Sequence, residues 1–363
     1  MSEGQKDPAP RGAGKPATIK DVARLSGVGI GTVSRYLNGT GAISAETRLR
    51  VAAAIAELDY RTNANAAALR GRTSPIIGVL VPDLENPAIA PIVKAIERLG
   101  RAAGYSLIVT SGDRDFTIEA EAISTLMSRG VAGLILIPTT DDGRALAAAL
   151  GEGDVPLVLM DRDFALVRPR TGRVFVAHDQ GMEQATRHLM ALGHRRLLLL
   201  HAADNRAAIN RVKGFERALA EAPEGADLRG VTLGCPRSRT AARDLAEAAL
   251  ASDDPPDAII SGHNRMLAGV LEAMRDRGLV AGRDLSVVTC DRTELAELHV
   301  PEIAWIDRNS DAIGVAAFEM FRQLKALPRQ SDVAPQDQIL PGNVTLGTVF
   351  HSGPSICSPA ARR

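Results

Sequence analysis

From Pro75 onward, short apolar runs alternate with longer amphipathic or alanine-rich stretches. The runs read IIGVLV, YSLIV, VAGLILI, PLVLM, RVFVA, RRLLLL, GVTL, DAII, LSVVT and EIAWI. Near-continuous apolar strands separated by helices are typical of parallel sheets that helices cover on both faces. About ten strands exceed one comfortable sheet, so two lobes of five or six strands fit better. The pattern therefore predicts a two-lobed α/β core with doubly wound parallel sheets.

Composition places the chain among globular proteins of two or three domains, with 363 residues of which 45% are hydrophobic. No apolar run is long enough to span a membrane, and residues 1–16 lack the apolar segment of a secretory signal. The 3 cysteines and 7 histidines have no disulfide or metal-ligand spacing. We therefore expect a cytoplasmic protein with no membrane partner, metal or cofactor.

Charge is distributed unevenly along the chain, although the net charge is zero. Residues 1–72 carry 11 Lys and Arg against 6 Asp and Glu, whereas the remainder carries 32 against 37. A basic amino-terminal piece on an acidic body suggests that only the first piece contacts a polyanion, although a chance fluctuation gives the same balance.

Residues 18–38 have the pattern of a helix-turn-helix. A helix over IKDVARLS, with Thr18 as N-cap, ends at Gly27, and a second helix over TVSRYLN follows the glycine-containing turn. A third helix is expected over residues 45–60. A helix-turn-helix places its second helix in the major groove. The alternative is a purely structural three-helix bundle.

The segment TIKDVARLSGVGIGTVSRYLNG, followed by AETRLRVAAAIAELDYRTNANAAALRGRT, resembles the DNA-binding headpiece of the LacI/GalR family of bacterial transcription regulators. The TVSRYLNG string is specific to that headpiece, and the resemblance covers about residues 17–350. It implies a helix-turn-helix headpiece on a two-lobed core like that of periplasmic binding proteins. It also implies a homodimer that binds a palindromic operator and responds to a small metabolite, commonly a sugar or nucleobase.

The resemblance also assigns roles against DNA. Ile30, Gly31 and Arg35 would read bases, Thr32 and Ser34 would contact phosphates, and Leu69 would wedge into the minor groove at the operator centre. The chain departs from the family at Gly29, where serine is usual, and in the hinge at Thr62 and Ala67. The full set of expected DNA-binding residues is Thr18, Ile30, Gly31, Thr32, Ser34, Arg35, Asn38, Asn63, Ala66 and Leu69.

The expected organisation is a disordered tail (1–16), a helix-turn-helix domain (17–61), a hinge helix or linker (62–73), a core (74–350) and a C-terminal tail (351–363). Within the core, the expected first lobe takes about 74–162 and 301–330, and the second about 163–300 and 331–350.

An effector should bind in the cleft between the lobes, beyond the carboxyl ends of the strands. Arg162 and Arg211 match effector-contacting residues of the family, whereas Arg265 stands where the family usually has aspartate. With Arg292, up to four guanidinium groups could face the cleft and hold an anion such as a sugar acid or sugar phosphate. The alternative is that these arginines pair with Asp161 or Asp291. The expected effector-binding residues are Asp83, Asn86, Ser111, Asp113, Thr139, Arg162, Phe164, Arg211, Asn264, Arg265, Asp291 and Trp305.

Three other classes of function compete with this one. A dinucleotide enzyme is opposed because no strand precedes the glycines at 27, 29 and 31, and no GxSxG, HExxH or P-loop motif occurs, so we expect no catalytic residues. An exported solute-binding protein is opposed by the missing signal and by the TVSRYLNG segment. The sequence therefore predicts a DNA-binding regulator that acts as a repressor. A regulator of this family with a degenerate, ligand-independent core remains the alternative.

Overall fold

The computed structural model describes residues 17–38, 40–60, 74–139, 142–162, 170–202, 205–328 and 342–359. Contacts divide the chain into two units, the first ending at Ser74 and the second beginning at Pro75. No helix within the described ranges is long and apolar enough to cross a membrane. The predicted tail (1–16), the whole predicted hinge (62–73) and Phe164 lie outside the described residues.

The described part of the first unit contains three helices, α1 (Ile19–Ser26), α2 (Ile30–Asn38) and α3 (Ala45–Glu57). Asp21 caps the start of α1, because its Oδ2 accepts hydrogen bonds from the Thr18 N–H at 3.0 Å and from the Thr18 hydroxyl at 2.8 Å. Gly27 ends α1 with a left-handed φ of 63°, a conformation that glycine adopts readily. The helices meet on the buried side chains of Val22, Val33 and Val51.

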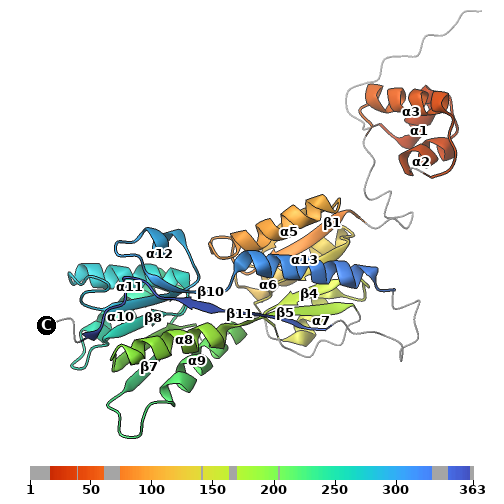
Figure 1. The fold of residues 1–363 in the computed structure, drawn as a ribbon. Coiled ribbons are helices and arrows are strands. Elements are labelled where there is room, and N and C mark those ends of the chain that lie inside the picture. The colour runs from red at the N-terminus through yellow and green to blue at the C-terminus, as the bar shows by residue number, and fades with distance from the viewer. Residues whose placement is uncertain are drawn as a thin grey trace, which may run out of the picture. The chain divides into compact units, whose positions relative to one another are not determined.

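The first lobe of the core is a six-stranded parallel sheet in the order β11-β5-β4-β3-β1-β2. Its strands are β1 (Ile76–Val81), β2 (Ser106–Ser111), β3 (Gly133–Leu136), β4 (Leu157–Met160), β5 (Thr171–Ala177) and β11 (Val344–Gly347). Neighbouring strand residues point to opposite faces, so Val79 packs with α5 (Ala90–Ala102) and α13 (Ser310–Ala326). Leu80 packs with α6 (Phe116–Ser128) and α7 (Gly143–Leu150). Helices α5 and α13 lie side by side (Figure 1).

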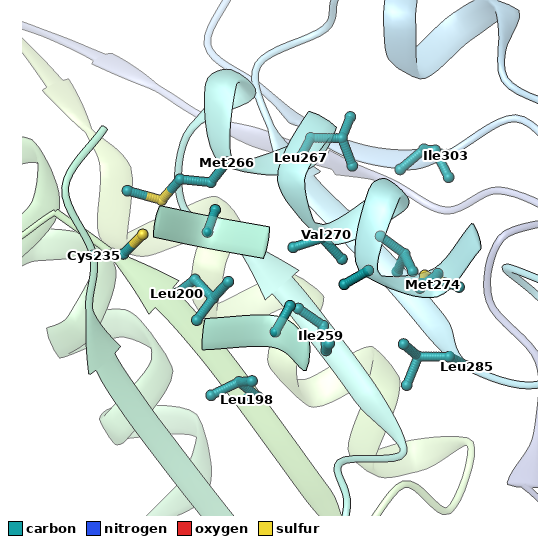
Figure 2. Close-up of a cluster of buried hydrophobic side chains, with 14 of the residues drawn as sticks. Leu198, Leu200, Cys235, Ile259, Met266, Leu267, Val270, Met274, Leu285 and Ile303 are labelled. Carbon is teal, nitrogen blue, oxygen red and sulfur yellow. The ribbon is translucent and has the colours of Figure 1, made fainter. Parts of the chain in front are cut away.

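The second lobe is a six-stranded sheet in the order β12-β10-β9-β8-β6-β7, parallel except for β12. Its strands are β6 (Arg196–His201), β7 (Arg229–Gly234), β8 (Ala258–Ser261), β9 (Ser286–Cys290), β10 (Ala304–Asp307) and β12 (Val349–His351). Helices α8 (His178–Ala191) and α9 (Arg206–Leu219) cover one face. Helices α10 (Arg239–Leu250) and α11 (Asn264–Asp276) cover the other, and α12 (Glu294–Leu298) follows β9. Figure 2 shows α11 side chains against strand residues Leu198, Leu200 and Ile259.

The ten predicted strands are present as β1–β10, and β11 and β12 are additional. The predicted lobe boundaries are wrong at three strands. Residues 171–177, expected in the second lobe, form β5 of the first sheet, and residues 304–307, expected in the first lobe, form β10 of the second. Residues 344–347, also expected in the second lobe, pair with β5. The apolar pattern of a buried strand is the same in either sheet, so it does not indicate which sheet the strand joins.

The predicted C-terminal tail also needs correction, because residues 351–359 belong to the second lobe. His351 pairs with Trp305 in the β10–β12 ladder. Ser355 is fully buried, and its Oγ accepts from the N–H of Ala304 at 2.8 Å and donates to the carbonyl of Val287 at 2.7 Å. This segment therefore covers the backbone of the second sheet rather than extending into solvent.

Candidate functional site

Helix α2 presents polar and small residues on the face opposite its buried Val33. Ile30, Gly31 and Arg35 are exposed, and Thr32 and Ser34 are half-buried. The Arg35 guanidinium lies along the helix, where Nη2 donates to Thr32 Oγ1 at 3.3 Å and Nε to the Gly31 carbonyl at 3.4 Å. Releasing these long bonds would let the guanidinium extend from the helix toward a base edge.

The other predicted DNA contacts are less defined. Thr18 is exposed at the start of α1, with its hydroxyl on Asp21. The side chain of Asn38 lies outside the described residues, as do Asn63, Ala66 and Leu69. Their roles stay predictions.

A polar cavity of about 80 Å³ lies between the two lobes of the core. Residues that line it follow the carboxyl ends of strands in both sheets, as expected for open α/β sheets. Its lining consists of Pro82, Asn86, Ile89, Arg114, Ile137, Thr139, Asp161 and Arg162 from the first lobe, and Asn205, Ala207, Arg211, Arg237, His263, Asp291 and Arg308 from the second lobe and the β10 connection. Arginines thus outnumber aspartates by five to two.

Five residues predicted for the effector line this cavity, namely Asn86, Thr139, Arg162, Arg211 and Asp291. The structure places the others that it describes elsewhere. Ser111 and Asp113 form a turn at the edge of the first lobe, where the Ser111 hydroxyl accepts from the N–H of Asp113 at 3.2 Å. Asp83 lies beside the cavity, and the ring of Trp305 stacks on His351 with centroids 5.5 Å apart.

Sequence reasoning missed three lining arginines. Arg114 and Arg237 each lie three residues after a strand, and Arg308 directly follows β10, at the strand ends that face the cavity. The strand-end rule that identified Arg162 applies equally to these three positions, so the signal was present in the sequence.

A hydrogen-bonded chain that includes the lining residues Asp161 and Arg211 connects the two lobes. Asp161 accepts from the Val176 N–H and from His178 Nε2, both at 2.9 Å. Arg211 Nη2 donates to His178 Nδ1 at 3.3 Å, and its Nη1 donates to the carbonyl of Gly262 at 2.9 Å. Burial, together with the charge of Arg211, lowers the pKa of His178 against the opposing effect of Asp161. The neutral ring then donates from Nε2 and accepts at Nδ1, which matches both contacts.

The carboxylates of the cavity remain ionised. Burial works against this, but the His178 and Val176 contacts hold the pKa of Asp161 below its ordinary value. The charges of Arg308 and Arg211 lower the pKa of Asp291 in the same way, and Arg308 Nε lies 2.9 Å from Asp291 Oδ1. The wall therefore keeps an excess of positive charge at neutral pH.

Contacts between the lobes close the cavity on the side of α11. Asn264 Nδ2 donates to Asn86 Oδ1 at 2.7 Å. The guanidinium of Arg265 pairs with Asp83, 3.2 Å away, and with Glu85. Neither Asn264 nor Arg265 lines the cavity, because these interlobe contacts direct both side chains toward the loop after β1.

Arg292 also lies outside the cavity. Its side chain is exposed, pairs with Glu297 and has its guanidinium carbon 5.8 Å from the centre of the Trp305 ring. Of the four predicted arginines, Arg162 and Arg211 line this cavity, whereas Arg265 and Arg292 line another one.

We expect His263, a buried residue of the cavity wall, to make the free energy of unfolding depend on pH. Burial lowers the pKa of His263 from 6.5 to about 3, with the nearby positive charges adding to the shift. The unfolded chain binds this proton near pH 6.5 and the folded chain does not, so stability is complete above that pH and falls as the pH decreases toward 3. Between pH 7 and 5 this group should cost about 2 kcal/mol of unfolding free energy.

Urea unfolding at the two pH values measures the effect. His263→Asn keeps a side chain that can cap α11 and should reduce the loss of stability by about 2 kcal/mol. His351→Asn, at an exposed position, is the matched control. An unchanged pH slope in His263→Asn would show that His263 is not the residue responsible.

A helix-turn-helix unit linked in sequence to a two-lobed core with a polar interlobe cavity defines a class of protein, the ligand-responsive DNA-binding regulators. The family model described as "Bacterial regulatory proteins, lacI family" matches residues 18–63. The model described as "Periplasmic binding proteins and sugar binding domain of LacI family" matches residues 74–339. The chain belongs to the LacI family of bacterial regulatory proteins.

Individual relatives agree with this membership. The HTH-type transcriptional regulator DegA of Bacillus subtilis is 30% identical over 89% of this chain and 95% of its own length. The lactose operon repressor of Escherichia coli is 30% identical over 90% and 89%. The lac repressor dimer bound to operator and the anti-inducer ONPF superposes with a TM-score of 0.78, at 28% identity, over 94% of this chain and 100% of the other. These relatives are transcriptional regulators and not enzymes, and among the described residues no group of three or more His, Cys, Asp and Glu side chains could hold a metal ion.

Proposed function

We propose that this protein is a homodimeric repressor that binds a palindromic operator and is controlled by an anionic metabolite in the interlobe cavity. The similar lac repressor is described as a dimer bound to operator, which supports the dimer and the two-fold operator. The exposed face of α2, with Ile30 and Arg35, supports direct reading of bases in the major groove.

Arg35→Ala tests the headpiece. A bidentate contact from arginine to a guanine is worth about 1–3 kcal/mol of discrimination, so the variant should keep weak, salt-sensitive binding but lose most sequence preference. The operator is first located by genome-wide occupancy. Fluorescence anisotropy then measures the ratio of the affinities for the operator and for random DNA.

Arg48→Ala is the matched control, because it removes the same charge from an exposed position of α3. It should leave the preference intact. An equal loss on operator and random DNA for Arg35→Ala would make Arg35 a phosphate contact instead.

The excess of arginine carries the effector proposal. Five guanidinium groups line the cavity against two carboxylates, and His178 and His263 are neutral because burial lowers their pKa values. Among the described residues, the hydrogen-bond partners of Arg211 are a carbonyl and an imidazole rather than a carboxylate. Arginine forks bind carboxylates and phosphates bidentately, which favours a sugar acid or sugar phosphate over a neutral sugar.

The size of the cavity sets a condition on the ligand. About 80 Å³ is well below the roughly 300–1,000 Å³ of pockets for larger ligands. A single small anion fits the closed cleft, whereas a sugar-sized anion requires the lobes to separate at the Asn86–Asn264 and Asp83–Arg265 contacts. Ligand binding and interlobe movement are therefore coupled, and a ligand shifts the balance only by its difference in affinity for the two states.

Thermal unfolding with a ligand panel tests the anionic class. Inorganic phosphate, gluconate and glucose 6-phosphate are compared with glucose, and operator affinity is measured in parallel. At least one anion should raise the melting temperature and change operator affinity, because a ligand that binds only the native state stabilises it. Glucose should do neither, and a stronger effect of glucose would contradict the proposal.

The second candidate is a regulator with a ligand-independent core. The small cavity and the direct bonds between the lobes favour it, since they hold the cleft closed without a ligand. Operator binding that no member of a wide metabolite panel changes, with no shift in melting temperature, would support this candidate over the first.

A further inference from the structure

One wall of the interlobe cavity is held by a buried acid that does not itself line the cavity. Glu119 on α6 is fully buried. Its carboxylate accepts from the backbone N–H of Thr139 at 2.8 Å and 2.9 Å and from the Thr139 hydroxyl at 2.6 Å. Gly112 leaves the space for this acid, because a Cβ there would lie 2.1 Å from Glu119 Cγ. The loop after β3 is thus anchored from behind the cavity.

This contact fixes the polarity of Thr139. A hydroxyl has one proton to donate, and Thr139 donates it to the Glu119 carboxylate. None of the hydrogen bonds described for Thr139 brings a proton to Oγ1, and the residue is half-buried in the cavity wall. Thr139 therefore offers a ligand the lone pairs of Oγ1 and no proton.

The arginines and the histidine of the wall have the complementary polarity. The arginines only donate. His263 Nδ1 accepts from the N–H of Arg265 at 3.2 Å, so the neutral ring carries its proton on Nε2 and is a donor to the cavity. Both Asp161 oxygens accept within the protein, and Asp291 is paired with Arg308. Thr139 is thus a neutral acceptor in a wall dominated by donors.

We propose that Thr139, positioned by Glu119, selects an effector that carries a hydroxyl or amine donor beside its anionic group. This inference rests on the proposed anionic effector and assigns the residue that distinguishes a sugar acid or sugar phosphate from a bare carboxylate or phosphate. The arginines hold the charge, and the donor group of the ligand binds Thr139 Oγ1. An analogue without the donor leaves Thr139 Oγ1 without a hydrogen-bond partner in a half-buried site. A site built to hydrogen-bond its ligand discriminates against such an analogue.

Calorimetric titration of the full-length protein with matched ligand pairs tests the proposal. The pairs are gluconate with hexanoate and glycerol 3-phosphate with propyl phosphate, so that carboxylate and phosphate sources are separated. In at least one pair the hydroxylated member should bind the wild type about tenfold more tightly. Thr139→Val should reduce that ratio to about twofold or less without weakening the other member, and Thr139→Ser should restore it.

Glu119→Gln tests the positioning role. Its amide can donate to Oγ1 and free the threonine hydroxyl to donate instead, so the preference should fall while binding of the unhydroxylated anion persists. Glu121→Gln, on the exposed side of the same helix, should leave the preference unchanged. Operator binding of each variant reports on folding, and the Thr139 variants decide the question if Glu119→Gln does not fold.

The outcomes separate this inference from the proposal on which it rests. Equal affinity for the two members of both pairs, or a preference that survives in Thr139→Val, overturns the role of Thr139 and leaves the anionic effector standing. If none of the four ligands binds the wild type, both the anionic effector and the role of Thr139 are overturned for these classes.

Discussion

Arg211→Met should weaken binding of the stabilising anion about 100-fold or more. Arg211 is buried in the cavity, and truncating one partner of a buried charged hydrogen bond typically costs about 2–5 kcal/mol. Methionine keeps most of the apolar stem, so the loss reports mainly on the guanidinium. The measurement is calorimetric titration with whichever member of the anion panel raises the melting temperature most.

Arg217→Met is the matched control for this substitution. Arg217 lies on the same helix, α9, but its side chain is 51% exposed and pairs with Asp179. It should leave anion affinity unchanged, because a surface ion pair contributes little. Arg211→Met should also bind operator normally without ligand but no longer respond to the anion. A retained response would remove Arg211 from the effector site.

Val33→Asp should abolish operator binding while leaving the core folded. Val33 is fully buried between the three helices of the headpiece. A carboxylate there has no partner among the described headpiece residues that pack on it, and burying an unpaired charge costs more than so small a domain can supply. We expect loss of operator binding by at least about 100-fold, with the core transition and the anion-induced stabilisation unchanged.

Ala53→Asp separates unfolding from repulsion by the DNA phosphates. It adds the same charge at an exposed position of α3, so it should leave the headpiece folded. Far-UV circular dichroism of the two variants and differential scanning calorimetry show which unit is lost. If Val33→Asp weakened operator binding no more than Ala53→Asp, the buried role of Val33 would be refuted.

The two sets of experiments address units that the contacts separate between Ser74 and Pro75. The headpiece is a small domain with one apolar cluster, whereas each lobe has apolar clusters on both faces of its sheet. Substitutions in one unit should therefore leave the stability of the other unchanged. The effects of substitutions on unfolding free energy are independent at distant sites that share no partners.

Local features could be read from the sequence because they depend on near neighbours. The start of α1 at Thr18 and its end at Gly27 follow from capping chemistry within a few residues. The strands β1–β10 follow from apolar runs that any buried strand shows. The rule that ligands bind beyond the carboxyl ends of parallel strands likewise identified Asn86, Thr139 and Arg162, which line the cavity, whereas Arg211 was expected there from the family resemblance alone.

Only the tertiary structure decided which distant groups meet. β5 lies in the first sheet and β10 in the second, the reverse of the expected assignment. Which sheet a strand joins depends on the neighbouring strands that the folded chain places beside it. Arg265 leaves the cavity because Asp83 and Glu85, about 180 residues earlier in the chain, lie opposite its guanidinium. Glu119 likewise determines what Thr139 offers a ligand. Sequence patterns record whether a side chain prefers burial or solvent, whereas the partner of a charge or hydroxyl depends on distances that exist only once the sheets have formed.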